Sequence, residues 1–568
     1  MKGSDSVLEM LKRYSVSHVF GLIGETSFPL YESWTRFPEI NHILVRDERN
    51  AILMADGYAR AGGKPGICEV PGVGASYSLP GIIEANNSGV PIIALSSDIS
   101  LSSEKRNYLT EYDKSAIFRS IVKEYISIND GSDIPRLIRR AFRAATSGRM
   151  GPVFIRFPIN VYDDQVDDAE IYAQNAFITY PSLRVSPEDQ LIEEAIRAIE
   201  GSSFPIIIAG QGVIFSHAEK QLQEFADYMK IPVGTTISGK GAVSELSELS
   251  LGVVGSRGGT AFSNETLSSA DLIIFIGTNA DSASTSEWKN PPYFAKNRKI
   301  IHIDISEFEL GNNYPTDIFL QGDAQLTIKK LMESAKGKST RRKEKINFAE
   351  RRKEELDFQL KLINRKFSSV NPMRIVKSIQ DIIPENSIIA ADPGVGAIYS
   401  STYFKVNSPG RKFLFNYSVG GLGFSLPAAI GAYFATNSTT LSLTTDGSFG
   451  FFEGELETLT RYRPDVKIVV VNNRAFGWIR ATMLSHYDRV IPGADFSSTD
   501  YSKIAAAHSI PYELAEKDSE LEEKMKIMVK TEGPFMLEIV TDPEDKIVPP
   551  VPEWKDTARK HGREFLGR

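Results

Sequence analysis

The chain has 568 residues, of which 42% are hydrophobic and 24% are charged, with a formal net charge of -7. A chain of this length is expected to form about three globular domains. No basic block is interleaved with aromatic residues, which argues against a nucleic-acid-binding protein. The longest apolar runs have the length of strands, which argues against a membrane protein.

The N-terminal residues MKGSDSVLEMLKRYSV predict an amphipathic helix and not a signal peptide. The single cysteine, Cys68, permits no internal disulfide, so we expect a cytoplasmic protein. Its neighbours in the run GICEV indicate a buried strand residue and not a nucleophile.

Short apolar runs alternate with helical segments along the whole chain. The first group is HVFGL, HILV, GICEV, PIIALSS and GPVFIRFP, the second is FPIIIAG, IPVGTT, DLIIFIG and KIIHIDIS, and the third is SIIAAD, TLSLT, KIVVV and PFMLEIV. This alternation predicts an α/β fold with three doubly wound, mostly parallel sheets.

Two polar segments separate these three groups of apolar runs. The second segment is predicted to be a charge-dense helix, typical of a solvated linker. We therefore expect an N-terminal domain, a central domain, a linker helix, a C-terminal domain and a tail, at residues 1–180, 186–335, 336–367, 368–545 and 546–568.

Polar residues follow two successive apolar runs of the third group. TLSLT leads into Asp446, Gly447 and Ser448, and KIVVV leads into Asn472 and Asn473. Because the carboxyl ends of parallel strands lie at one edge of a sheet, Asp446 and Asn473 are expected to meet there. Such oxygens suit Mg²⁺, and a Gly-Ser turn suits phosphate. Taken alone, either fragment is more simply an ordinary turn.

Asp-Gly-Ser followed one strand later by Asn is the signature of thiamine diphosphate enzymes. The chain resembles the acetolactate synthase and pyruvate oxidase group of that family over nearly its whole length. The resemblance implies thiamine diphosphate and Mg²⁺ as cofactors. It also implies that the metal is held by Asp446, Asn473 and the backbone carbonyl of Ala475. Thr445 stands where the family usually has glycine.

The segment RDERNAILMADGYARAGGKPGICEV resembles the family's N-terminal motif and assigns Glu48 as the glutamate facing N1′ of the aminopyrimidine. Proton exchange there activates C2 of the thiazolium, and it works best when the carboxyl is desolvated and its pKa is raised. Composition alone would make Glu48 a surface residue of a charged cluster. Asp47 stands where the family often has His.

Two further segments, GGLGFSLPAAIGA and ADPGVGAIY, resemble cofactor loops of the family. Leu422 takes the place of the bulky apolar residue that bends the cofactor, so the resemblance implies Glu48 and Leu422 as the catalytic pair. The cofactor contacts that it implies are Glu48, Gly394, Val395, Gly396, Gly420, Leu422, Asp446, Gly447, Ser448, Asn473, Phe476 and Gly477.

The second group resembles the family's central domain at AGQGV, GTTISGKG, GTNADSAST and HIDIS. GTTISGKG also resembles a P-loop, but Gly241 stands where a P-loop has Ser or Thr, so we do not expect a nucleoside triphosphatase. In relatives this domain binds FAD, binds ADP or CoA, or binds nothing. The arginine pattern of flavin-bearing acetolactate synthases is absent after Gly277, which weakens the case for FAD and leaves it open. Asp304 is either a ribose ligand or a loop cap.

The residues expected on the substrate side of the site differ from those usual in the family. Leu109 and Thr110 replace the usual Phe and Gln, and Glu25 and Thr26 lie where an acceptor could approach. Arg480 either pairs with a substrate carboxylate or phosphate or is a surface residue.

The resemblance implies an enzyme that decarboxylates a 2-oxo acid and joins the remainder to a second carbonyl, as acetolactate synthase does. The alternatives are a flavin-dependent oxidase, a simple decarboxylase or a 2-hydroxyacyl-CoA lyase, and a non-catalytic homologue is a different class. In the family, the N-terminal domain binds the aminopyrimidine and the C-terminal domain binds the diphosphate. The chain is therefore expected to form a homodimer or homotetramer with active sites at the subunit interface.

Overall fold

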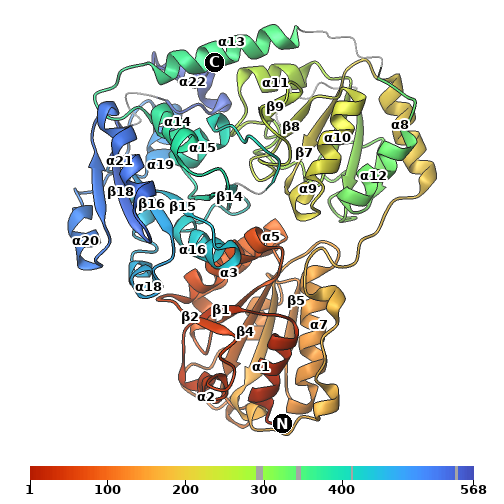
Figure 1. The fold of residues 1–568 in the computed structure, drawn as a ribbon, viewed down its shortest axis with the longest axis vertical. Coiled ribbons are helices and arrows are strands. Elements are labelled where there is room, and N and C mark those ends of the chain that lie inside the picture. The colour runs from red at the N-terminus through yellow and green to blue at the C-terminus, as the bar shows by residue number, and fades with distance from the viewer. Residues whose placement is uncertain (289–297, 341–346, 411–412, 544–547, 568) are drawn as a thin grey trace. The chain divides into compact units, whose positions relative to one another are not determined.

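The computed structural model describes residues 1–568 except 289–297, 341–346, 411–412, 544–547 and 568, and except the side chain of Val395 (Figure 1). Parts of the expected linker and tail therefore lie outside the described residues. The strands form three six-stranded parallel sheets with flanking helices, which confirms the expected fold class. The chain falls into two compact units, one comprising Met1–Leu183, Ser418–Ser442 and Phe451–Val466, and the other Arg184–Tyr417, Leu443–Gly450 and Lys467–Arg568. The expected domain boundaries stay predictions.

The first sheet has the strand order β2-β1-β3-β4-β6-β5. Its strands are β1 (His18–Gly21), β2 (Asn41–Leu44), β3 (Gly66–Glu69), β4 (Ile92–Asp98), β5 (Glu124–Ser127) and β6 (Val153–Pro158). One face shares an apolar core with α1 (Gly3–Arg13), α2 (Phe28–Trp34) and α7 (Ile134–Thr146). On the other face, Phe20 packs edge-on against Tyr58 of α3 (Glu48–Gly62), and Cys68 is fully buried as expected. The shorter helices of this part are α4 (Gly74–Tyr77), α5 (Leu79–Ser88) and α6 (Lys114–Phe118).

Helix α3 also packs closely against α16 (Ser425–Thr436) of the same compact unit. A Cβ on Gly57 would stand 2.1 Å from the carbonyl oxygen of Ala428, and a Cβ on Gly431 would stand 1.9 Å from that of Met54. Larger residues at these two positions would push the helices apart. The contact fixes the path of α3, which begins at Glu48, and of α16, which begins shortly after Leu422.

The central sheet has the order β12-β11-β10-β7-β8-β9, which is the Rossmann order. Its strands are β7 (Pro205–Ala209), β8 (Val233–Thr235), β9 (Ser250–Val253), β10 (Leu272–Ile276), β11 (Lys299–Asp304) and β12 (Ile318–Gln321). One face forms a core with α8 (Asp189–Gly201), α9 (Gln211–Phe215), α10 (Glu219–Met229) and α12 (Ala324–Ser334). The other face packs against α11 (Ala261–Ser268).

The third sheet has the order β14-β13-β15-β16-β18-β17, which repeats the order of the first sheet. Its strands are β13 (Ile388–Ala391), β14 (Phe413–Phe415), β15 (Thr440–Thr445), β16 (Val466–Asn472), β17 (Tyr512–Ala515) and β18 (Phe535–Val540). The remaining helices are α13 (Phe348–Ile363), α14 (Pro372–Ile382), α15 (Val395–Tyr403), α17 (Asp446–Phe449), α18 (Glu455–Tyr462), α19 (Gly477–Tyr487), α20 (Tyr501–Ala507), α21 (Asp518–Lys530) and α22 (Lys555–Lys560).

The strand order of the first and third sheets reverses between their first and third strands in chain order, that is, between β1 and β3 and between β13 and β15. Loops at the carboxyl ends of strands beside such a reversal usually form the ligand crevice of an open α/β sheet. The candidate site residues that follow β13 and β15 therefore lie where this fold class binds ligands.

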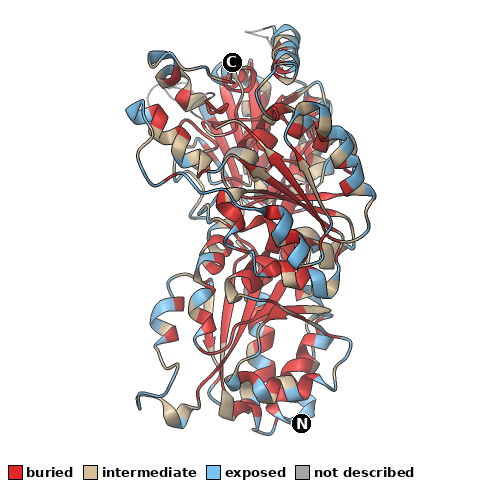
Figure 2. Cartoon of the chain, turned by 90° about the vertical axis from the view of Figure 1, so that its left-hand side faces the viewer, coloured by how far each residue is buried: buried red, intermediate tan, exposed pale blue. Residues whose placement is uncertain are grey.

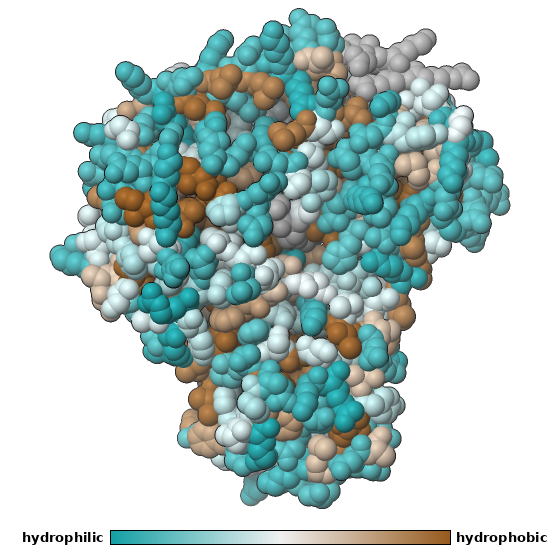
Figure 3. Space-filling view, viewed as in Figure 1, coloured by the Kyte–Doolittle hydropathy of each residue, from teal (hydrophilic) through white to brown (hydrophobic). Residues whose placement is uncertain are grey.

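Buried residues gather on the sheets and on the inner sides of the helices (Figure 2). The face shown in Figure 3 is mainly hydrophilic and carries separate apolar patches. Among the described helices, none is both long enough and apolar enough to cross a membrane.

Candidate functional site

Asp446 and Asn473 meet at one backbone N–H group. Asp446 begins α17 directly after β15, and Asn473 follows β16, the neighbouring strand. The N–H of Ala475 lies 3.0 Å from Oδ2 of Asp446 and 3.2 Å from Oδ1 of Asn473. Arg474, between them, has a φ of 59° and turns the chain so that Ala475 faces both side chains. The structure therefore brings together the three residues that the family resemblance assigns to a metal.

The carboxyl group of Asp446 is largely shielded from water. Burial raises its pKa to about 6, while hydrogen bonds from backbone N–H groups, those of Gly447 and Ala475 first, act in the opposite direction. A buried carboxylate whose charge is opposed by desolvation is strongly stabilised by a nearby cation. This environment favours a metal ion beside Asp446.

The turn that follows Asp446 carries an unused hydroxyl. Oγ of Ser448 is buried and has no hydrogen-bond partner among the described residues. Buried polar atoms are usually satisfied, so an orphaned hydroxyl in a loop suggests a missing ligand oxygen. Gly447 makes room here, because a Cβ at this position would stand 2.8 Å from the ring of Phe476. Phe476 and Gly477 lie at the start of α19.

A second loop of the third sheet lies beside this turn. Thr444 donates from Oγ1 to Oδ2 of Asp392 at 2.7 Å, which ties the end of β15 to the loop after β13. In that loop Gly394 has a φ of 132°, and Val395 and Gly396 form the first turn of α15. The loops that follow β13 and β15 are thus held together at the strand reversal.

Glu48 is the first residue of α3, and Asp47 caps that helix by accepting a hydrogen bond from the N–H of Arg49 at 2.8 Å. The side chain is half-buried, and burial raises the pKa of its carboxyl, with a smaller contribution from the negative charge of Asp47. The raised pKa is the property expected of a carboxyl group that exchanges protons near neutral pH.

Gly74 provides the space for the Glu48 carboxylate. A Cβ on Gly74 would stand 2.1 Å from Oε1 and 2.6 Å from Cδ of Glu48. Gly74 begins α4 in the sequence PGVGAS that follows β3. The sequence analysis did not identify Gly74. The sequence signal that could have identified it is the pair Gly72 and Gly74, two glycines that follow the buried strand β3.

Leu422 is half-buried and lies between two glycines with left-handed backbone angles, Gly420 with a φ of 75° and Gly423 with a φ of 85°. A Cβ on Gly423 would stand 2.5 Å from Cβ of Phe451, whose carbonyl accepts a hydrogen bond from Nη2 of Arg49 at 2.8 Å. The chain beside Glu48 and the chain beside Leu422 are thus both held against Phe451.

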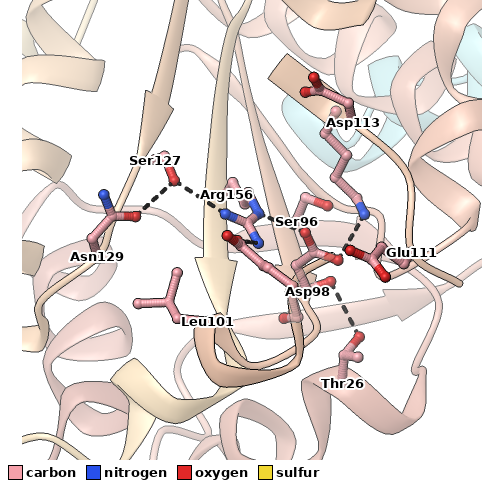
Figure 4. Close-up of polar contacts among 12 residues, drawn as sticks. Thr26, Ser96, Asp98, Leu101, Glu111, Asp113, Ser127, Asn129 and Arg156 are labelled. Carbon is pink, nitrogen blue, oxygen red and sulfur yellow. Dashed lines mark hydrogen bonds and ion pairs between the residues drawn. The ribbon is translucent and has the colours of Figure 1, made fainter. Parts of the chain in front are cut away.

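The segment that carries Leu109 and Thr110 is held at both ends by buried charges. Asp98, at the end of β4, contacts Nζ of Lys114 at 2.7 Å and Nε of Arg156 at 2.5 Å (Figure 4). Arg156 also binds Glu104 at 2.5 Å. Because Lys114 and Asp98 are almost fully buried, breaking this network would leave uncompensated buried charges. The network fixes the ends of the segment, while Leu109 is 81% exposed.

Two threonine hydroxyls lie near the loop that follows β3. Oγ1 of Thr26 and Oγ1 of Thr110 each lie 3.8 Å from the point where a Cβ on Gly72 would stand. Thr26 is held by a hydrogen bond from its hydroxyl to the carbonyl of Ser97 at 3.1 Å. Gly72 is two residues from Gly74, the residue that contacts Glu48. The structure therefore places both threonines near the Glu48 half of the site.

Two other candidates are placed differently. Glu25 is exposed in a short 3-10 turn, and Arg480 forms an ion pair with Asp495. Asp495 in turn forms an antiparallel bridge with Ala475. The ion pair points to a role for Arg480 that neither interpretation named, because it holds the loop after α19 against the turn that carries Ala475.

Comparisons with known proteins agree with this geometry. Family models for the thiamine pyrophosphate enzymes match three stretches of the chain: the N-terminal TPP binding domain at residues 1–117, the central domain at 192–331 and the C-terminal TPP binding domain at 392–539. A probable acetolactate synthase large subunit from Methanocaldococcus jannaschii is 32% identical over 97% of this chain and 94% of its own length.

The chain belongs to the thiamine pyrophosphate enzyme family. An acetolactate synthase large subunit from Lactococcus lactis is 30% identical over 100% of this chain and 96% of its own length. Acetolactate synthase 1 of Nicotiana tabacum is 29% identical over 97% of this chain and 83% of its own length. The chain is accordingly a thiamine diphosphate-dependent enzyme.

The described residues fit the family's cofactor. Within the described part of the chain, no group of three or more His, Cys, Asp or Glu side chains could hold a metal, so a metal here needs other oxygens beside the carboxylate of Asp446. The amide oxygen of Asn473, the carbonyl of Ala475 and the diphosphate would supply them, as Mg²⁺ often requires. The unpartnered hydroxyl of Ser448 would then have a phosphate oxygen within reach.

The contact between Gly74 and Glu48 leads to a prediction. In Gly74→Ala the new Cβ should displace the Glu48 carboxylate, because the two atoms would overlap. We expect the exchange of the C2 proton of bound thiamine diphosphate to slow by roughly 10-fold or more, measured by proton NMR. Gly201→Ala is the matched control, since Gly201 is a residue of helix α8 and a Cβ there meets no atom within 4 Å. Equal exchange rates in both variants and the wild type would contradict the role given to Gly74.

The P-loop-like segment of the central domain does not present its lysine to solvent. Lys240 is buried and forms an ion pair at 2.7 Å with Glu245, which is also buried. Asp304 accepts a hydrogen bond from the N–H of Ser306 at 2.9 Å, as expected of a loop cap. The structure thus supports a structural role for Lys240.

Proposed function

We propose that the chain binds thiamine diphosphate and Mg²⁺, decarboxylates a 2-oxo acid such as pyruvate and joins the remainder to a second carbonyl compound, as an acetolactate synthase does. The observation that carries the proposal is the meeting of Asp446, Asn473 and Ala475 within a chain that is similar over its whole length to acetolactate synthase large subunits. Intact candidate residues in both halves of the site argue against a non-catalytic homologue.

Thiamine diphosphate supplies a nucleophilic carbon at C2 of its thiazolium and accepts the electron pair released when CO₂ leaves. In the proposal, Asp446, Asn473 and the Ala475 carbonyl hold Mg²⁺ and thereby the diphosphate. Glu48 exchanges a proton with the aminopyrimidine, and the half-buried carboxyl with its raised pKa supports that role. Leu422 supplies the apolar contact that bends the cofactor.

The diphosphate end of the cofactor has further proposed contacts in the third sheet. These are Gly394, Val395, Gly396, Gly447, Ser448, Phe476 and Gly477, with the backbone of Gly420 facing the aminopyrimidine. The short turns after β13 and β15 and the Ser448 hydroxyl, which no described residue binds, support this assignment.

Carboligation and decarboxylation differ in whether a carbonyl compound or a proton reacts first after CO₂ is lost. Leu109 and Thr110 are smaller than the Phe and Gln that the family usually carries, which leaves room for an acceptor. The hydroxyl of Thr110, which lies near Gly72, can donate a hydrogen bond to a polar acceptor, while the hydroxyl of Thr26 already donates to the carbonyl of Ser97 and can only accept one. These features favour carboligation with an acceptor larger than pyruvate.

The experiment that tests the proposal is to incubate the purified protein with thiamine diphosphate, Mg²⁺ and pyruvate, and to identify the products by mass spectrometry. Acetolactate is the expected product. Acetaldehyde alone would replace the proposal with a decarboxylase, and acetate with hydrogen peroxide would replace it with an oxidase. If pyruvate is not consumed, oxalyl-CoA and 2-hydroxyacyl-CoA are the next donors to test, and the proposal for pyruvate is wrong.

The acceptor space leads to a second prediction. The double variant Leu109→Phe with Thr110→Gln should keep the reaction of pyruvate with itself but lose about 10-fold in the rate with bulkier 2-oxo acids or aldehydes, because both new side chains fill space. The measurement is the ratio of the two products in a mixed-acceptor assay. Leu183→Phe is a control for an added exposed aromatic ring, since Leu183 is an exposed residue remote in sequence from the loop. An unchanged ratio in the double variant would contradict the assignment.

A third prediction concerns flavin. Because the arginine pattern of flavin-bearing relatives is absent after Gly277, we expect the purified protein to be colourless and to stay colourless after FAD is added and the excess removed. The measurement is an absorption spectrum in the near-ultraviolet and visible range, where a bound flavin absorbs. A stoichiometric flavin spectrum would favour the oxidase.

We also propose that the protein is cytoplasmic and forms a homodimer or homotetramer whose sites use residues of two subunits. Exposed apolar side chains close to Glu48 support this, since Val73 is 46% exposed and Tyr77 is 58% exposed on either side of Gly74. Apolar side chains grouped beside a functional residue often mark a protein–protein contact. Size-exclusion chromatography with light scattering measures the subunit number.

A further inference from the structure

Glu69 is a fully buried carboxyl group that has no part in the proposed reaction so far. It is the last residue of β3, and its exposed fraction is zero. No cation among the described residues forms an ion pair with it, and the groups that bind it are the hydroxyls of Tyr31 and Ser97. A buried carboxylate without a counter-ion is so costly that the group keeps its proton instead. Glu69 therefore stores one proton inside the N-terminal sheet.

Glu69 lies in the middle of a chain of hydrogen bonds. On one side, the Tyr31 hydroxyl donates to Oε2 of Glu69 at 3.3 Å and lies 2.7 Å from Nε2 of His42. On the other side, the Ser97 hydroxyl donates to Oε1 at 3.3 Å and lies 2.7 Å from the hydroxyl of Tyr162. Tyr31 and His42 are partly exposed, whereas Ser97 and Tyr162 are fully buried. The chain thus reaches solvent at His42 and ends in the core at Tyr162.

The chain between His42 and Glu69 has two arrangements of its protons, because Tyr31 has one proton and two partners. In the first, a doubly protonated His42 donates to Tyr31, and Tyr31 donates to the Glu69 carboxylate. In the second, Glu69 holds the proton and donates to Tyr31, and Tyr31 donates to a neutral His42. The shift from the first to the second carries a proton inward without moving a heavy atom. Burial lowers the pKa of His42 to about 4, so its charged form gives up a proton readily.

The inner end of this chain lies close to Glu48, within the same compact unit. Gly21 of β1 pairs on one side with Leu44, which leads into the turn before Glu48, and on the other side with Glu69. Gly21 places no side chain between the two strand ends, and the loop after Glu69 carries Gly74, which contacts Glu48. The electrostatics agree with this placement. Burial is the largest cause of the raised pKa of Glu69, and the negative charge of Glu48 adds to it.

The proposed reaction takes up one proton in each turnover. Two pyruvate anions and one proton give one acetolactate anion and CO₂, so the charges balance only if a proton enters the site. Decarboxylation of pyruvate to acetaldehyde has the same requirement. Exchange between Glu48 and the cofactor moves a proton within the site and adds none to it. The reaction therefore needs a supply of protons from solvent that reaches Glu48.

We propose that His42, Tyr31 and Glu69 form a relay that carries this proton from solvent to Glu48. Glu69 gives its proton to the Glu48 carboxylate and becomes a carboxylate itself, and Tyr31 turns its O–H toward it. His42 then gains a proton from water and passes one to Tyr31, while Tyr31 passes its own to Glu69. The three groups regain their first state, and Glu48 has gained the one proton that water lost. The relay rests on the proposed function and adds residues that act through Glu48.

The test compares Glu69→Gln with the wild type in assays of acetolactate formation in water and in deuterated water. Glutamine keeps the shape and the hydrogen bonds of the side chain but cannot release a proton. We expect kcat to fall by roughly 100-fold, the lower range for loss of an acid–base group, and the solvent isotope effect on kcat to rise. The KM for pyruvate, the Tm and the calorimetric affinity for thiamine diphosphate with Mg²⁺ should stay as in the wild type. Glu69→Asp should recover part of kcat because it restores the proton.

Two tyrosines of the same chain provide a matched pair of variants. Tyr31→Phe and Tyr162→Phe each remove one hydroxyl, but Tyr31 stands between Glu69 and His42, and Tyr162 stands at the closed end. Tyr31→Phe should lower kcat by roughly 10-fold or more, because it cuts the path from solvent. Tyr162→Phe should keep kcat within about two-fold of the wild type. Equal losses in the two variants would overturn the relay.

An unchanged kcat and isotope effect in Glu69→Gln would also overturn the relay. A fall in kcat together with a lower Tm or weaker thiamine diphosphate binding would overturn it too, because it would assign Glu69 to the fold. A wild type that makes only acetaldehyde would refute carboligation, while the same variants would still test proton uptake.

If the wild type does not consume pyruvate, the proposed function is wrong, and the relay has a separate test. Exchange of the C2 proton of bound thiamine diphosphate with deuterated water, measured by proton NMR, needs no substrate. Roughly 10-fold slower exchange in Glu69→Gln than in Tyr162→Phe supports the relay, and equal exchange refutes it.

Discussion

Replacement of Asp446 by alanine should abolish Mg²⁺-dependent binding of thiamine diphosphate while the fold survives. Asp446 is the one carboxylate among the proposed ligands, and Asn473 and the Ala475 carbonyl offer neutral oxygens. Loss of groups that merely support a ligand already costs about 10- to 100-fold in metal affinity, so loss of the ligand itself should cost roughly 100-fold or more.

The measurement is a calorimetric titration of the cofactor-free protein with thiamine diphosphate, with and without Mg²⁺. Asp446→Asn is the variant of equal shape, and it tests the charge without removing the side chain. The stability of the cofactor-free protein should not decrease, because burial already disfavours the charged form of Asp446. The Tm of the cofactor-free variants should therefore equal or exceed that of the wild type, and the Tm increase on adding both cofactors should vanish.

A matched control is available in the same sheet. Asp392 is buried at the end of β13 and accepts the hydrogen bond from Thr444, but it is not one of the proposed ligands. Asp392→Asn should keep metal-dependent binding to within a few-fold. Undiminished thiamine diphosphate affinity in Asp446→Ala would show that the metal is held elsewhere.

The second large effect is expected for Glu48→Gln. Glutamine preserves the shape of the side chain but cannot exchange a proton, so the C2 proton of bound thiamine diphosphate should exchange with solvent about 10²- to 10⁴-fold more slowly. Cofactor affinity should change little, because the diphosphate and the metal have their proposed ligands in the other compact unit. Proton NMR after quenching in deuterated acid measures the exchange directly.

Asp47→Asn is the control for Glu48→Gln. Asp47 is the neighbouring carboxylate and the cap of α3, and its negative charge contributes to the raised pKa of Glu48. Removal of that charge should lower the pKa of Glu48 slightly and leave proton exchange within a few-fold of the wild type. If Glu48→Gln exchanges as fast as Asp47→Asn, Glu48 has no part in proton transfer.

The inner strands of the three sheets were predictable from the sequence, and most of the edge strands were not. The runs that predicted strands correspond to the inner strands of all three sheets and to β2. The strands that the sequence did not indicate, β5, β9, β12, β14 and β17, are all sheet edges. An edge strand has one neighbour and is often partly exposed, as EYIS in β5 and YELA in β17 are, so it lacks the apolar run that marks a buried strand.

The candidate site shows the same limit. Asp446 and Asn473 could be paired from the sequence because each directly follows a strand, and parallel strands bring such positions together. Gly74 could not be paired with Glu48 in this way. The contact joins segments whose approach depends on how a helix and a loop pack against each other, and no local periodicity encodes that. The family resemblance supplied the role of Glu48, while the structure alone revealed its contact with Gly74.

The most direct test of the account uses [2-¹³C]pyruvate as the sole substrate, with thiamine diphosphate and Mg²⁺, followed by ¹³C NMR. Joining of two substrate molecules places two labelled carbons next to each other, so we predict acetolactate whose carbonyl and carbinol signals are each split by one-bond carbon–carbon coupling. Singlets from acetaldehyde or acetate, with no coupled pair, would contradict the claim that this enzyme makes a carbon–carbon bond.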